Sequence, residues 1–250
     1  MTRFGIAILL CLYISFGAGA APPQTLKISE QNASLLGRLG DYADLEALSI
    51  SCIEKLRALP DSIGTLAKLK TLIIDNGNGC SMNPLLPESI GNLHLLEKLV
   101  LYGAQDPGGT NGERTVQPRE RHKFPASMSQ LKNLTYLDLG RNALEEIPDF
   151  VKDLPMLREL RFQWNGKFKT VPAFIVNLHE LRTLSLDGND LSDVPSFLST
   201  LPKLTRVSLG DNCSITQSAA RIRELKRRFP KIVFDFEDEY DCPSPEPSKR

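Results

Sequence analysis

Apolar residues recur along the chain in a fixed order after each of six prolines. An apolar residue follows the proline by three positions, leucines follow at further intervals of three, and an apolar residue stands two positions after the last leucine. The six prolines are Pro60, Pro87, Pro125, Pro148, Pro172 and Pro195. They lie 23, 24 or 27 residues apart, with one interval of 38. Self-similarity at a period of this length indicates a solenoid of stacked repeats.

Two spacings alternate within each repeat, and each predicts a different element. After Pro172 the apolar positions are Ile175, Leu178, Leu181, Leu184 and Leu186. The interval of two at the end predicts a strand whose apolar residues point inward and whose intervening residue points outward. The intervals of three suit a tight 3₁₀ turn on the opposite side, and proline at its start costs little. Because one repeat cannot bury its own leucines, we expect stacked repeats that form a parallel sheet.

The segments LTYLDLGRNAL at 134–144 and LRTLSLDGNDL at 181–191 resemble the leucine-rich repeat family, whose core is L-x-x-L-x-L-x-x-N-x-L. The preceding LPESIGNL and VPAFIVNL are similar to typical, Ras-group and bacterial repeats. The resemblance implies an α/β fold: a curved horseshoe solenoid with a parallel β-sheet on the concave face and short helices or 3₁₀ turns on the convex face. It also implies a structural column of buried asparagines, because the amide both donates and accepts. That column would be Asn142, Asn165, Asn189 and Asn212.

Composition shifts divide the chain around these repeats. Residues 1–20 read as a signal peptide, because a short basic start precedes an apolar run that ends in small residues. We expect an N-terminal lead and cap at 21–44, and leucine-rich repeats at 45–215. A non-periodic loop is inserted there at 102–123. A cap at 216–236 follows, with Ala219, Ile222, Leu225 and Phe229 on one helical face, and its last strand is aligned on Ile232 and Phe234. The proline-rich and acidic tail at 237–250 is predicted to be disordered.

Four cysteines remain after the signal peptide, which favours disulfides in an exported chain. Cys52 and Cys80 follow strands of adjacent repeats, and Cys213 and Cys242 follow the last two strands. Neighbouring strands lie about 4.8 Å apart, within the range that a disulfide spans. We therefore predict the pairs Cys52–Cys80 and Cys213–Cys242, and a secreted or extracytoplasmic location, either extracellular or periplasmic.

The balanced charge and the lack of known catalytic motifs limit the classes of function that the sequence favours. Lysine plus arginine equals aspartate plus glutamate, so nothing favours nucleic acid as a partner, and no second apolar run could span a membrane. The chain has no glycine-rich phosphate loop, no nucleophile elbow and no HExxH motif. His94 and His179 occupy equivalent outer positions and cannot share a metal. We predict a monomeric protein that is not an enzyme and has no cofactor and no metal.

The outward positions of the strands carry large and charged residues in the central repeats. These are Tyr102, Tyr136, Asp138, Arg141, Glu159, Arg161, Gln163 and Trp164, with Asp187 in the next repeat. Trp164 is the single tryptophan and has no inward position to fill, because Phe162 takes that place. Interface hot spots are enriched in tryptophan, tyrosine and arginine. We therefore expect Trp164, with Tyr136 and Arg161, to anchor a partner, and local packing of Trp164 at the solenoid edge is the alternative.

Several functions fit such a face. The resemblance implies an exported binding protein that recognises a protein or peptide on the concave face. The same residue types suit carbohydrate or cell-wall binding. A structural envelope component and a secreted host-interaction (virulence) effector are further alternatives.

Overall fold

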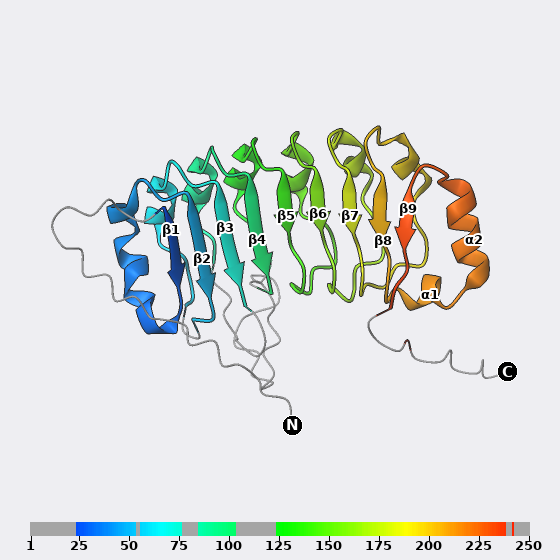
Figure 1. Ribbon diagram of the computed structural model, residues 1–250, viewed down its shortest axis with the longest axis horizontal. Helices are drawn as coiled ribbons and strands as arrows, with labels where there is room; N and C mark the ends of the chain where they lie inside the picture. The colour runs from blue at the N-terminus through cyan, green and yellow to red at the C-terminus, as the bar shows by residue number, and fades with distance from the viewer. Residues whose placement is uncertain (1–23, 54–55, 77–84, 104–123, 239–241, 243–250) are drawn as a thin grey trace, which may run out of the picture.

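The predicted solenoid with one parallel sheet is confirmed. The computed structural model describes residues 24–53, 56–76, 85–103, 124–238 and 242. Nine strands pair in chain order, each parallel to the next (Figure 1). They are β1 (Thr25–Ile28), β2 (Ala47–Ser51), β3 (Thr71–Asp75), β4 (Lys98–Tyr102), β5 (Tyr136–Asp138), β6 (Glu159–Arg161), β7 (Thr183–Ser185), β8 (Arg206–Ser208) and β9 (Val233–Asp235).

Short 3₁₀ helices follow six of the strands and lie behind the sheet. They are η2 (Asp61–Thr65), η3 (Glu88–Asn92), η4 (Ala126–Gln130), η5 (Asp149–Asp153), η6 (Ala173–Asn177) and η7 (Ser196–Thr200). Each repeat proline stands one residue before the helix, and its carbonyl accepts the first helical bond, as from Ile63 N to Pro60 O at 3.0 Å. Proline suits this site because a helix leaves its first N–H groups unbonded.

The core lies between the sheet and the 3₁₀ helices. Both inward residues of the fifth repeat, Leu137 and Leu139, are fully buried, as are the leucines that lead to them. Phe162 is also fully buried, and its ring meets that of Phe168 edge to face at 4.7 Å. The alternation predicted for the strands is therefore present, and it leaves the intervening residues on the other side of the sheet, here called the strand face.

The asparagine column joins successive repeats beneath the strand ends. Asn165 Oδ1 accepts from Asn142 N at 3.0 Å, and Asn189 Oδ1 accepts from Asn165 N at 3.1 Å. Asn212 donates to Leu186 O at 2.9 Å. All four asparagines are at most 7% exposed. Their role is thus to satisfy backbone groups that would otherwise be buried without partners.

The N-terminal end differs from the expectation in one element. The residues read as a lead contain β1, which pairs with β2 and extends the sheet by one strand. The 3₁₀ helix η1 (Glu30–Tyr42) follows and buries Leu36, Leu39 and Tyr42 against the core. It begins after Ser29, whose N–H donates to Asn32 Oδ1 at 2.7 Å. One face of η1 therefore covers the first repeat, at the blue end of Figure 1.

Two α-helices, α1 (Cys213–Thr216) and α2 (Ala219–Arg228), cover the other end of the core. Leu225 and Phe229 are 2% exposed, and Phe229 packs on Phe234 with ring centroids 5.7 Å apart. Ala219, expected on the buried face, is exposed in the first turn. Arg228 binds Asp193 at 2.6 Å, so one of the cap's basic residues holds it to the last repeat.

Two properties of the described residues concern membranes and metal ions. None of their helices combines the length and apolar character that a membrane crossing requires. They also contain no group of three or more His, Cys, Asp or Glu side chains that could hold a metal ion. The loop at 104–123, His122 and Cys80 lie outside the described residues, so the predicted pair Cys52–Cys80 stays a prediction.

Candidate functional site on the strand face

Six of the strands, β2 and β4 to β8, end in a backbone turn that glycine favours. The left-handed positions at these turns are Cys52 (φ 39°), Gly103 (61°), Arg141 (57°), Trp164 (60°), Gly188 (63°) and Asp211 (54°). Glycine adopts this conformation freely, whereas a residue with a Cβ pays about 1–2 kcal/mol. Arg141, Trp164 and Asp211 therefore present large or charged side chains at a conformational cost.

Trp164 lies between the repeat before it and the repeat after it. Its indole covers Gly188, where a Cβ would come within 2.1 Å of Trp164 Cε3. The Arg141 guanidinium carbon lies 5.8 Å from the indole centre and 5.8 Å from the Tyr102 ring centre. The indole is neither buried nor fully exposed. Trp164 thus packs against its neighbours and also lies on the strand face.

Gln163, one position before Trp164, also reaches over a glycine of a neighbouring repeat. A Cβ on Gly140 would lie 3.0 Å from Gln163 Cδ and 3.0 Å from Tyr102 Cδ2. Tyr102 and Gln163 therefore approach each other over the glycine between them. Gln163 Oε1 is buried and has no hydrogen-bond partner in the part of the chain that the structure describes.

A second group on the strand face surrounds Tyr136. Lys98 Nζ lies 4.6 Å from the ring centre, and the Arg161 guanidinium carbon lies 5.5 Å from it. Arg161 Nε also donates to Glu159 Oε1 at 2.6 Å, within the same strand. The structure thus brings Tyr136 together with Arg161, while Trp164 meets Arg141 and Tyr102 instead.

Asp138 is a buried carboxylate of the strand face. Its side chain is only 6% exposed, and its Oδ1 accepts from Gly140 N at 2.9 Å. Burial raises the pKa of its carboxyl above the ordinary value, and the hydrogen bond from Gly140 and the charge of Arg161 partly offset this. Asp138 supports the strand face from beneath, and its role as a contact residue stays a prediction.

A groove of about 390 Å³ opens on the strand face over β6–β9. Its side toward the N-terminus is lined by Tyr102, Arg141, Arg161, Gln163 and Trp164. Its side toward the C-terminus is lined by Ser185, Asp187, Ser208, Asp211, Asp235 and Glu237. Six of the nine residues predicted as contacts line this groove, whereas Tyr136, Asp138 and Glu159 do not.

The register of β9 differs from the one expected from the sequence pattern. For that reason the pattern did not place the carboxylates of this strand in the groove. Alignment of Ile232 and Phe234 as the inward pair placed Val233 in the middle outward column. In the structure Val233 pairs with Arg206, and Asp235 pairs with Ser208. The strand is shifted by two residues, which keeps the inward and outward alternation but moves Asp235 into the groove. Phe236, a partly buried apolar residue two positions after Phe234, was the available signal.

Asp187 is the best-anchored carboxylate of the groove. Its Oδ2 accepts from Ser208 Oγ and its Oδ1 accepts from Gly210 N at 2.9 Å. Burial raises the pKa of its carboxyl, the two hydrogen bonds lower it, and the nearby Asp235 raises it further. The side chain is therefore fixed in place beside other acidic groups.

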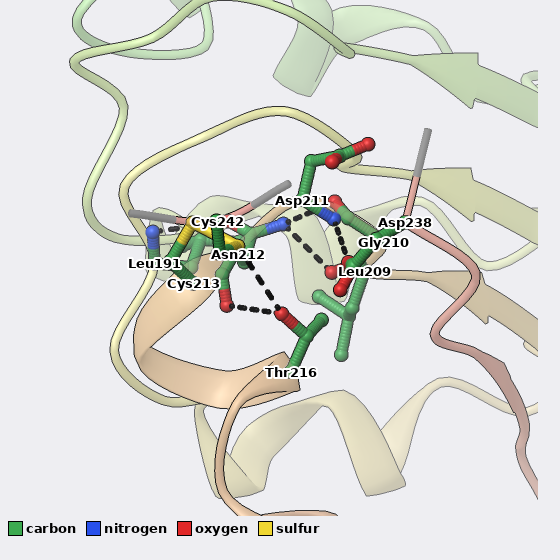
Figure 2. The surroundings of a disulfide bond; sticks show 9 residues. All are labelled: Leu191, Leu209, Gly210, Asp211, Asn212, Cys213, Thr216, Asp238 and Cys242. Atoms are coloured by element: carbon green, nitrogen blue, oxygen red, sulfur yellow. Dashed lines mark hydrogen bonds between the residues drawn. A yellow bond between two sulfur atoms is a disulfide. The ribbon is translucent and has the colours of Figure 1, made fainter. Parts of the chain in front are cut away.

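The start of the C-terminal tail closes this end of the groove. Glu237 O lies so close to Gly210 that a Cβ there would come within 1.9 Å. Asp238 Oδ1 accepts from Asp211 N at 2.5 Å, and Cys242 forms a disulfide with Cys213, with Cα atoms 5.5 Å apart (Figure 2). Residues 237, 238 and 242, predicted to belong to a disordered tail, are thus held against the last repeat.

Comparison with known proteins agrees with the repeat pattern. The family model described as Leucine Rich Repeat matches residues 133–154. The chain carries leucine-rich repeats. No curated protein matches this leucine-rich repeat chain.

Three solved structures show the range of similar proteins. An internalin from Listeria monocytogenes is 19% identical over 80% of this chain and 49% of its own, with a TM-score of 0.50. The Arabidopsis receptor kinase HAESA, in complex with the peptide hormone IDA and the co-receptor SERK1, is 22% identical over 70% and 27%, with a TM-score of 0.52. A leucine-rich repeat protein of Leptospira interrogans is 26% identical over 80% and 57%, with a TM-score of 0.46. This chain therefore spans 49% of the internalin and 57% of the Leptospira protein, and the likeness concerns the fold.

Proposed function

We propose that the chain is a binding protein whose strand face holds a protein or peptide partner in the groove over β6–β9. One observation carries this proposal. Arg141, Trp164 and Asp211 occupy left-handed positions at which Gly103 and Gly188 show the unstrained choice, and all three line the groove. Side chains kept at strained backbone positions gather at functional sites.

The chemistry of the groove favours a protein ligand. Tryptophan, tyrosine and arginine contribute much of the binding free energy in protein interfaces. Here Tyr102, Arg141 and Trp164 lie together on one side of the groove. Leucine-rich repeat solenoids expose an extended surface of this kind, and peptide binding by the fold has a precedent in the HAESA complex.

The proposal includes export and the absence of catalysis. A disulfide between Cys213 and Cys242 suits an oxidising compartment, either extracellular or periplasmic. The groove is lined by carboxylates, arginines and aromatic rings that act by contact and charge. We therefore propose an exported, monomeric, non-enzymatic protein.

Capture experiments with two glycine variants test the function. Arg141→Gly and Asp211→Gly each remove a groove side chain at a position whose φ suits glycine, so the thermal midpoint should hold or rise. Immobilised wild-type protein is exposed to surface extract of the source organism and, separately, to a polysaccharide panel. Arg223→Ala, an exposed arginine of α2 outside the groove, is the matched control.

The proposed function expects a defined protein or peptide that binds the wild type and the control but not the groove variants. Retention of that partner by both glycine variants would place the binding surface elsewhere. Polysaccharide retention that is lost in the same variants would instead support the carbohydrate alternative.

A further inference from the structure

The groove has oppositely charged ends along one line of the sheet. The strand register aligns Arg161, Ser185, Ser208 and Asp235 on four neighbouring strands, β6 to β9. The two serines have short side chains and form the floor between the charged ends. A ligand that lies in the groove across the strands therefore meets a guanidinium at one end and a carboxylate at the other.

Four carboxylates line the acidic end of the groove. Asp187, Asp235 and Glu237 line it together with Asp211. Within the described residues, no lysine or arginine forms a salt bridge with Asp187, Asp235 or Glu237. Their hydrogen bonds come from neutral groups, such as Ser208 Oγ and Gly210 N to Asp187 and Glu237 N to Asp235. Uncompensated carboxylates in a groove attract a positive group from a ligand.

The other end supplies groups for the opposite charge and for an apolar surface. Arg141 is exposed, and its cation faces the rings of Tyr102 and Trp164. Arg161 shares its charge with Glu159 but is 43% exposed. Two guanidinium groups at this end can therefore donate hydrogen bonds to a carboxylate, bidentately in the usual arginine geometry.

The distance between the ends sets the length of the ligand. Three strand intervals of about 4.8 Å separate β6 from β9, or about 14 Å in all. An extended peptide advances about 3.3 Å per residue, so about four residues span that distance.

We infer that the groove binds a peptide segment carrying a basic and an acidic side chain about four residues apart, with the basic one over β8 and β9. This inference rests on the proposed function and adds the chemical class of the ligand and its direction across the sheet.

Selection from a displayed library of short random peptides tests the inference. The immobilised full chain is used as the wild type, as Arg141→Gly, as the double variant Asp187→Asn, Asp235→Asn, and as Glu146→Gln. The double variant removes two charges and keeps one acceptor oxygen at each position. At position 187 the new amide nitrogen replaces one of the two accepting oxygens and can donate to Ser208 Oγ instead. Glu146 is an exposed carboxylate that does not line the groove, so its variant controls for loss of charge.

We expect peptides selected by the wild type and by Glu146→Gln to carry a lysine or arginine about four residues from an aspartate or glutamate. The affinity of these peptides for the double variant should be at least tenfold lower. Peptides that depend on Arg141 but show no preference for a basic residue, or keep their affinity for the double variant, would overturn the inference and leave the proposed function standing. Absence of any selected peptide whose binding depends on Arg141 would overturn both.

Discussion

The indole of Trp164 occupies the space that a side chain at Gly188 would need. A Cβ on Gly188 would lie 2.1 Å from Cε3, 2.5 Å from Cδ2 and 2.6 Å from Cζ3 of the indole. Both residues have φ near 60° and lie at the same turn of consecutive repeats. The tryptophan of one repeat thus depends on the glycine of the next, and this fixes the indole at the rim of the groove.

Gly188→Ala should displace the indole and destabilise the fold. The new methyl group must move the ring, and the alanine must hold a left-handed φ of 63°. The two costs together should lower the free energy of unfolding by about 2–4 kcal/mol. Because Trp164 is the single tryptophan, its fluorescence emission reports the displacement directly.

Gly166→Ala separates the two costs. Gly166 also has a φ of 63°, but a Cβ there would have no atom within 4 Å. It should therefore lose only about 1 kcal/mol and leave the emission maximum unchanged. Equal losses in the two variants would show that the ring yields without cost and that the contact with Gly188 contributes nothing.

Asp138→Asn should change how stability depends on pH. Burial holds the pKa of the Asp138 carboxyl above its ordinary 3.8, so the unfolded chain loses this proton first as the pH rises. Between the ordinary and the raised pKa the folded state binds more protons, and this carboxyl makes the wild type less stable as the pH rises. Asparagine keeps an oxygen for the Gly140 N–H and does not titrate.

The stability of Asp138→Asn relative to the wild type should therefore increase as the pH rises from below 3.8 toward neutrality, and then level off. Denaturant unfolding at several pH values measures this difference, with Glu146→Gln as an exposed control. A difference that shrinks with rising pH would mean that Arg161 stabilises the charged carboxylate more than burial penalises it.

Much of the fold could be predicted because the inward residues obey one rule in every repeat. Leu137 and Leu139 are buried for the same reason as Leu184 and Leu186, so the pattern alone gives strands, turns and parallel pairing. The asparagine column follows from the same register. Such periodicity carries no information about ends, where a repeat has a neighbour on one side only.

The pattern failed at the two ends of the solenoid and at contacts between neighbouring repeats. The strand Thr25–Ile28 has two inward residues but lacks the proline and leucines that precede the other strands at fixed spacing, so the pattern did not reveal it. The register of Val233–Asp235 is decided by packing of Phe234 and Phe236, which a spacing rule cannot resolve. The glycines Gly140, Gly188 and Gly210 are each covered by atoms from neighbouring repeats, a contact that the spacing of residues does not show.

Asn189→Ala should unfold the solenoid more readily than any substitution of an exposed asparagine. Asn189 Nδ2 donates to Phe162 O at 2.9 Å and Leu186 O at 2.8 Å, and Oδ1 accepts from Asn165 N. Alanine leaves these buried backbone groups without partners, at a cost of about 3 kcal/mol. Asn177→Ala, at an exposed position of η6, should cost less than about 1 kcal/mol. Similar losses in both variants, measured by denaturant unfolding, would contradict a stabilising column.

Loss of the Cys213–Cys242 disulfide should loosen the acidic end of the groove before the rest of the sheet. The bond closes a loop across a sequence separation of 29, worth on the order of 3 kcal/mol in the chain-entropy model. It also holds the tail whose Asp238 accepts from Asp211 N (Figure 2). In Cys242→Ser the amide hydrogen of Asp211 should exchange faster. The amide of Leu209 provides an internal comparison, because it donates to Asp235 O at 2.8 Å within the sheet and should keep its protection. Unchanged exchange at Asp211 would show that β9 alone positions the tail, and loss at both sites would show that the disulfide holds the last strand as well.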